Sequence, residues 1–305
     1  MNKLEANISL LFITFISATQ NSFLIWIPDS IPHFAFICIT NLLGFIMSLA
    51  CFFGELFRLD VKQIKQSMVL ATELIFFNLF LMLAVSGLGA VMTNILQSSV
   101  LVFISVIAFL LYKQIPDIGT MLGIITVLSG LAVMTEGNID SLWNWNVLFL
   151  MISNVFFAFY IVTIGEYSSS SNPAIIAMGQ MFFCFLFSLI LWGIQALTQG
   201  AAFTLPSDPK FWGSVIYISF FIRLLYGVVQ MYAQRYTTPL NTALILSIEV
   251  VITMAISPVL SAFMGTVPEV ITPLKVAGGA IMIFGILMTE PQFFNMLRKM
   301  FHGKD

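Results

Sequence analysis

Long apolar runs alternate with short polar connections along almost the whole chain. A helix that spans a bilayer needs about 20 mostly apolar residues, and ten segments of this sequence reach that length. Because the connections between them are short, no separate soluble domain is expected. The predicted spans cover residues 8–27, 33–53, 67–86, 90–112, 117–135, 146–165, 173–197, 211–232, 240–263 and 270–289.

The amino-acid composition indicates which class of protein this pattern belongs to. Hydrophobic residues make up 59% of the chain and charged residues only 9%, whereas soluble domains carry about 25% charged residues. The sequence therefore predicts an all-α integral membrane protein. It has no GxxxxGK(S/T) loop, no CxxC or Cys/His pairing, and no Ser/His or paired-Asp set within the spans. We expect no enzyme activity, no metal or other cofactor, and no nucleic-acid partner.

The basic residues predict the orientation in the membrane. With the N-terminus in the cytoplasm, only Lys210 and Lys275 fall on the outer side. Cytoplasmic loops are enriched in Lys and Arg, so both termini are expected in the cytoplasm, in a cytoplasmic (inner or plasma) membrane. The basic residues on the cytoplasmic side are then Lys3, Arg58, Lys62, Lys65, Lys113, Arg235, Arg298, Lys299 and Lys304.

The two halves of the chain also resemble each other in sequence. Glycines seven residues apart mark the fifth and tenth predicted spans: Gly123 with Gly130, and Gly278 with Gly285. A proline–acid step precedes each pair, and the two halves align at an offset of about 150 residues. Each half holds an odd number of spans, so the second copy is expected upside down, as in many secondary transporters. The predicted units are a first five-helix repeat (1–139), an inverted second repeat (140–290) and a basic amphipathic cytoplasmic tail (291–305).

Residues 237–288 resemble the repeat signature of the drug/metabolite transporter superfamily, in its ten-helix EamA-type branch. Glu249 lies where that pattern has a Leu-Glu-Pro-Val step, although Val250 replaces the proline. Residues 94–134 carry a weaker copy, in which Ser99-Val100 replaces the Glu-Pro pair. The resemblance implies a ten-helix carrier of small metabolites, working in the direction of export. It also implies that helices one, three, four, six, eight and nine surround a central cavity.

Three charged residues fall inside predicted spans: Glu73, Arg223 and Glu249. A charge at the bilayer centre costs about 3 kcal/mol on insertion scales, so such groups face the interior and pair. Glu73 and Arg223 are equivalent positions under the repeat offset, which predicts an ion pair between them. Two interpretations stay open: the pair only ties the halves together, or it has a role in transport. In the second, Arg223 binds a carboxylate or phosphate of the substrate, since a guanidinium takes an oxyanion bidentately, or the pair breaks and re-forms during transport.

Glu249 is the candidate for proton coupling, because a carboxylate in a low-dielectric site can take up and release a proton. The alternative is a protonated side chain bonded to a neighbouring helix. Uncharged polar and aromatic residues of the central helices complete the candidate substrate-binding set, with interhelical hydrogen bonding as their alternative role. They are Gln20, Asn21, Asn94, Gln97, Asn154, Gln230, Tyr160 and Tyr226.

These features favour a secondary active transporter that moves a small polar, amino-acid-like metabolite by alternating access. Export and coupling to protons are part of this hypothesis. The expected partners are the substrate, the lipid bilayer and protons, with monomer and homodimer both open. The alternative function is a passive channel or a lipid-translocating membrane protein.

Overall fold

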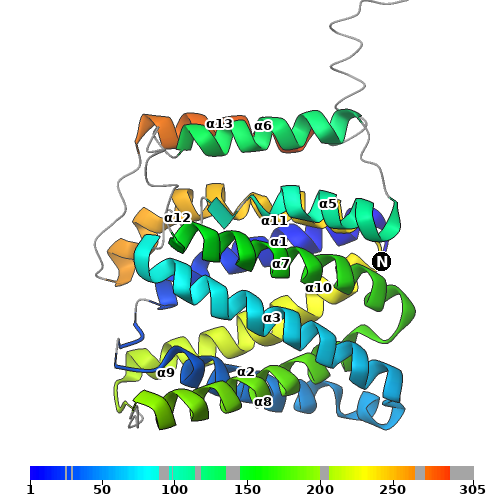
Figure 1. Cartoon of the computed structure of the whole chain (residues 1–305), viewed down its shortest axis with the longest axis vertical. Helices are drawn as coiled ribbons and strands as arrows, with labels where there is room; N and C mark the ends of the chain where they lie inside the picture. Colours follow the sequence, from blue (N-terminus) through cyan, green and yellow to red (C-terminus); the bar gives the residue numbers. More distant parts are fainter. Residues whose placement is uncertain are drawn as a thin grey trace, which may run out of the picture.

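The structure is a computed structural model that describes residues 1–24, 26–28, 30–88, 96–97, 99–113, 118–134, 145–199, 206–264 and 272–288. These residues form helices and short turns, with no strand among them. Figure 1 shows the helices stacked side by side and running across the view. The predicted all-α class is therefore confirmed.

Each predicted span overlaps one or more helices. In the first half of the chain these are α1 (Lys3–Leu24), α2 (His33–Phe52), α3 (Val61–Leu88), α5 (Val100–Tyr112) and α6 (Ile118–Met134), with a 3-10 turn, η1 (Phe53–Arg58), after α2. In the second half they are α7 (Trp145–Ser170), α8 (Pro173–Gln199), α9 (Pro209–Tyr217), η3 (Ile218–Tyr226), α10 (Gly227–Gln234), α11 (Pro239–Ser247), α12 (Glu249–Met264) and α13 (Pro273–Met288).

Six helical segments of the described chain are long and apolar enough to cross a membrane. They are His33–Arg58, Val61–Ala84, Trp145–Ser170, Pro173–Thr198, Pro209–Gln234 and Pro239–Ile256. Large apolar side chains also point outwards, such as Leu197, 89% exposed, and Phe57, 79% exposed. Lipid accommodates such a surface, whereas water does not. The chain is a multi-pass membrane protein, and ten crossings with both termini in the cytoplasm stay a prediction.

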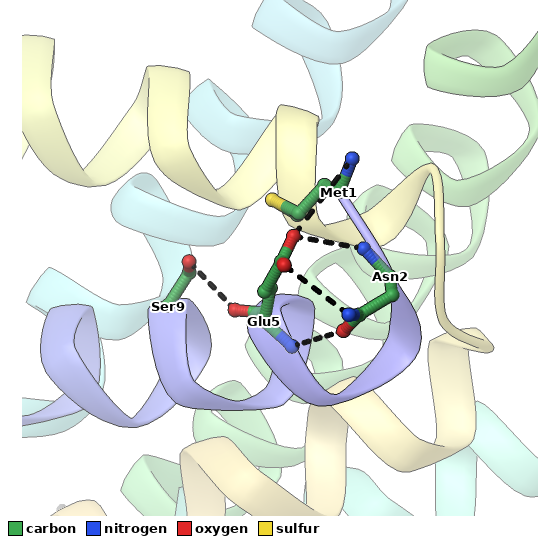
Figure 2. A network of polar contacts seen from close by, with 4 residues as sticks. All are labelled: Met1, Asn2, Glu5 and Ser9. Carbon is green, nitrogen blue, oxygen red and sulfur yellow. Dashed lines mark hydrogen bonds and ion pairs between the residues drawn. The ribbon is translucent and has the colours of Figure 1, made fainter.

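The first helix starts with a reciprocal cap, shown in Figure 2. The backbone N–H of Glu5 donates to Asn2 Oδ1 at 2.9 Å, and the backbone N–H of Asn2 donates to Glu5 Oε2 at 2.9 Å. The N-terminal amine lies 3.9 Å from the same Oε2 atom. Because the first turn of a helix leaves its N–H groups without partners, this arrangement fixes where α1 begins.

The paired glycines lie where α6 and α13 meet, in the outermost layer of Figure 1. A Cβ on Gly130 would lie 2.6 Å from the carbonyl oxygen of Gly278, and one on Gly285 would lie 2.8 Å from that of Gly123. The contacts pair the start of one helix with the end of the other, so the two helices run antiparallel. The glycine pattern thus marks a close backbone contact between the two halves of the chain.

Two helices are interrupted at equivalent places. Ser99 and Ile248 are the turn residues before α5 and α12, with φ and ψ of −63° and −10° at Ser99 and −62° and −20° at Ile248. Each donates its backbone N–H three residues back, Ser99 to Leu96 and Ile248 to Ile245. The interruptions are 149 residues apart (248 − 99), which agrees with the predicted repeat offset. Inversion of the second copy stays a prediction.

We expect Gly130→Ala and Gly285→Ala each to destabilise the protein by about 1–3 kcal/mol, because the new methyl group would overlap backbone atoms of the facing helix. Thermal unfolding of the purified protein in detergent measures this as a lower Tm. Gly193→Ala on α8 is the matched control, since a Cβ there would meet no atom within 4 Å. Equal Tm values for Gly130→Ala and Gly193→Ala would contradict the close contact.

Candidate functional site

The predicted ion pair between Glu73 and Arg223 is wrong. Ion pairs among the described residues join the N-terminal amine to Glu5 and Arg58 to Glu55, and both Glu73 and Arg223 belong to the described part of the chain. The physical reason is that the two side chains face different helices. Equivalence under the repeat offset places both near the middle of their helices, but it does not make them face each other.

Glu73 on α3 faces α7. Its Oε1 accepts a hydrogen bond of 3.0 Å from the hydroxyl of Thr163, and its buried Oε2 has no hydrogen-bond partner. A neutral hydroxyl therefore holds the carboxylate, and half of its hydrogen-bonding capacity is left unused.

Arg223 lies in an unusual helical segment. Residues Ile218–Tyr226 form a π-helix between α9 and α10. π-Helical turns are rare and are frequently found at functional sites. The helix approaches α2 closely here, because a Cβ on Gly44 would lie 2.9 Å from the Cβ of Arg223. The Nε of Arg223 is buried without a hydrogen-bond partner. The guanidinium thus keeps a donor that no described protein group uses.

Glu249 is the first residue of α12, directly after the interruption at Ile248. Its Oε2 accepts a hydrogen bond of 2.9 Å from the hydroxyl of Ser17 on α1. The hydrogen bond therefore joins α12 to α1.

The first helix of each half is bonded to the other half. From α7, Asn154 Nδ2 donates to the carbonyl oxygen of Leu96 at 3.2 Å and to Ser99 Oγ at 3.0 Å, which secures the interruption before α5. From α1, Ser17 binds Glu249 after the matching interruption. Thr19 on α1 also shares a hydrogen bond with the Tyr217 hydroxyl of α9. The first helix of each half of the sequence is thus hydrogen-bonded to helices of the other half.

The remaining predicted residues are spread over the same helices. Tyr160 is buried, and its hydroxyl accepts a hydrogen bond of 2.9 Å from Gln180 Nε2. Gln230 is fully buried with both amide atoms unpaired. Gln20, Gln97 and Tyr226 are half-buried. Asn94 lies outside the described residues, and the side chain of Asn21 is not among those described.

Several residues of this arrangement were missed from the sequence. Thr163 and Ser17 bind the two intramembrane carboxylates, but a lone hydroxyl residue in an apolar helix gives no specific signal. Gln180 and Gln234 are amides inside apolar segments, and the same rule that selected Gln230 would have found them. The importance of Gly44 can be recognised only from the structure, in which it packs closely against Arg223.

Comparison with known proteins agrees with the predicted resemblance. The model of the EamA-like transporter family matches residues 144–290. An uncharacterized transporter of Archaeoglobus fulgidus is 24% identical over 201 residues, which is 64% of this chain and 58% of that protein. The match thus spans less than two thirds of the relative's own length.

A solved crystal structure has a similar fold. It superimposes with a TM-score of 0.73 over 95% of this chain and 98% of the other, at 11% sequence identity. At so low an identity the likeness shows the fold alone. The match to the EamA-like transporter family and the similarity to a transporter agree with the superfamily that the sequence led us to expect.

We expect Glu73→Gln to change the free energy of unfolding by less than about 0.5 kcal/mol, because the amide oxygen can still accept from Thr163 and no ion pair is lost. Removing one partner of a buried ion pair would cost about 3–5 kcal/mol. Thermal unfolding in detergent distinguishes the small effect that we expect from the large effect of a lost ion pair. Thr163→Val is the matched variant and should lower the Tm. A double-mutant cycle of Glu73→Gln with Arg223→Gln that gave an interaction energy above about 1 kcal/mol would contradict our assignment.

Proposed function

We propose, from the match of residues 144–290 to the EamA-like transporter family, that this protein is a secondary active transporter of a small polar metabolite. The substrate carries a carboxylate or phosphate, and an amino-acid-like molecule fits because the interior offers both signs of charge. The protein works by alternating access in the cytoplasmic membrane, in the direction of export, with both termini in the cytoplasm.

The observation that carries this proposal is that Arg223, inside a candidate span, forms no ion pair with a carboxylate of the described residues. Arg223 lies within the candidate span Pro209–Gln234 and has a buried Nε without a partner. Charged groups within a membrane are costly and are retained where they serve a function. A guanidinium that no described carboxylate neutralises is available to bind an anionic group of the substrate, which supports the substrate-binding interpretation over a fixed link between the halves.

The hydrogen bonds between the halves suggest how access alternates. Glu73 accepts a hydrogen bond from one hydroxyl of α7, the first helix of the second half. Glu249 accepts one from a hydroxyl of α1, the first helix of the first half. A hydrogen bond from a hydroxyl to a carboxylate contributes about 1.5–3 kcal/mol net, which is small enough for it to break and re-form during a transport cycle. Protonation of Glu249 would weaken its hold on Ser17 and so link proton movement to the separation of α1 from α12.

Counterflow in proteoliposomes tests the class of function. Candidate substrates come first from a thermal-shift screen of amino acids, nucleosides, sugars and quaternary amines, because a bound ligand stabilises the folded state. A carrier shows saturation and trans-stimulation with the ligand found. Flux without trans-stimulation would instead support a passive channel, and lipid movement alone would support a lipid-translocating protein.

We expect Arg223→Lys to weaken the affinity for the anionic substrate at least about tenfold, because lysine keeps the charge but loses the bidentate geometry. The Kd from thermal shift or calorimetry is the measurement. The Tm without ligand serves as the control and should stay close to that of the wild type. Unchanged affinity in a folded Arg223→Lys protein would remove Arg223 from the binding site.

We expect Glu249→Gln to abolish uphill, proton-driven transport while exchange of substrate across the membrane continues. Glutamine can still accept from Ser17, but it cannot carry a proton. The assay compares accumulation under an imposed pH gradient with counterflow in its absence. Wild-type accumulation by this variant would exclude Glu249 as the coupling residue.

A further inference from the structure

Helix α10 carries two glutamines whose side-chain amides have no partners. Gln230 is 0% exposed and Gln234 is 2% exposed. The Nε2 and Oε1 atoms of both residues lack a hydrogen-bond partner in the described structure. Four amide atoms within little more than one helical turn are therefore buried and unused.

The two glutamines share the interior face of the helix. Residues four apart in a helix lie above one another, which places Gln230 and Gln234 side by side. Tyr232, two residues from each, lies on the opposite face and is 38% exposed. Helix α10 packs against α1, α7 and α8, so the glutamine face is directed into the protein rather than towards lipid.

Two other buried glutamines, Gln66 and Gln180, each have an unpaired Oε1 atom but a paired Nε2 atom. Gln66 donates from Nε2 to the Ser170 hydroxyl at 3.3 Å, and Gln180 donates from Nε2 to the Tyr160 hydroxyl at 2.9 Å. These side chains link helices. Burying an amide with no partner costs roughly 2–7 kcal/mol, so an interhelical role does not explain Gln230 and Gln234. A ligand that offers both a donor and an acceptor does.

We propose that Gln230 and Gln234 form an amide-binding subsite for a linear organic anion that contains peptide-like amide groups. The amide of the ligand pairs with the side-chain amides, while its carboxylate binds Arg223. This inference rests on the proposed transport function and specifies its substrate class. In the present conformation the subsite is closed, and it opens when α1 and α7 separate during the transport cycle.

The spacing sets the length of the ligand. Gln230 follows Arg223 by seven residues, or about 10 Å along the axis at 1.5 Å per residue. An extended peptide advances about 3.3 Å per residue, so three residues cover this distance. A tripeptide with its terminal carboxylate at Arg223 places its farther peptide bond about 7 Å away, two residues along the chain. The long, flexible side chains of Arg223 and the two glutamines span the remaining distance.

Triglycine and 8-aminooctanoate are the probes that test the subsite. They have the same chain length and the same charged ends, but methylenes replace both peptide bonds in 8-aminooctanoate. We expect the wild-type protein to bind triglycine at least about tenfold more tightly, since the hydrocarbon leaves the glutamine amides unpaired. Calorimetry gives the affinities, and counterflow shows whether the bound probe is carried.

Gln230→Met and Gln234→Met keep the length of the side chain and remove its donor and acceptor. Each should weaken triglycine binding about tenfold and leave 8-aminooctanoate binding unchanged. The Tm without ligand should stay the same or rise, because no hydrogen bond within the protein is lost. Gln66→Met, whose residue lies outside the subsite, is the matched control and should alter neither affinity.

The proposal is overturned if the wild type binds both probes equally or binds neither, or if the methionine variants weaken both probes alike. Arg223→Lys separates this failure from that of the transport function. If the carrier shows counterflow of another anion that depends on Arg223, while triglycine binding is absent or insensitive to the glutamines, only the amide subsite is wrong. If no anion shows saturable counterflow, the proposed function itself fails.

Discussion

The structure depends on one constraint: a polar group inside a bilayer has no water to bond with, so the protein itself must supply its partner. The constraint acts most strongly where helices are interrupted and where charges lie within spans. At the interruption before α5 the partner comes from Asn154, and at the start of α12 it comes from Ser17. Both belong to the first helix of the other half, so satisfying the buried polar groups also joins the halves.

Because of these hydrogen bonds, the two halves of the sequence are not separate structural units. A boundary near residue 139 divides the sequence, but hydrogen bonds from α7 to α3 and from α1 to α12 cross it. Helix α1 is bonded to the second half and α7 to the first. Separating α1 from α12, or α7 from α3, would break these hydrogen bonds.

Much of the helix layout could be predicted from the sequence, because apolar length and short polar connections are local properties. The glycine pairs of α6 and α13 were also visible, since their spacing reports a helix face in contact with another backbone. The Glu73–Arg223 pair was not correctly predicted. The offset gives equivalent depth, whereas contact depends on which neighbour each side chain faces, α7 for Glu73 and α2 for Arg223. The π-helix around Arg223 had no signal, because it differs from an α-helix only in hydrogen-bond register.

The close contact between α6 and α13 constrains how the chain can diverge. At Gly130 and Gly285 the backbone of one helix touches that of the other, with no side chain to adjust between them. Two packed helices can change independently wherever a flexible side chain between them absorbs the difference. At this contact they cannot, because a larger residue on either helix displaces the whole facing helix. Substitution is therefore most restricted where the side chains are smallest.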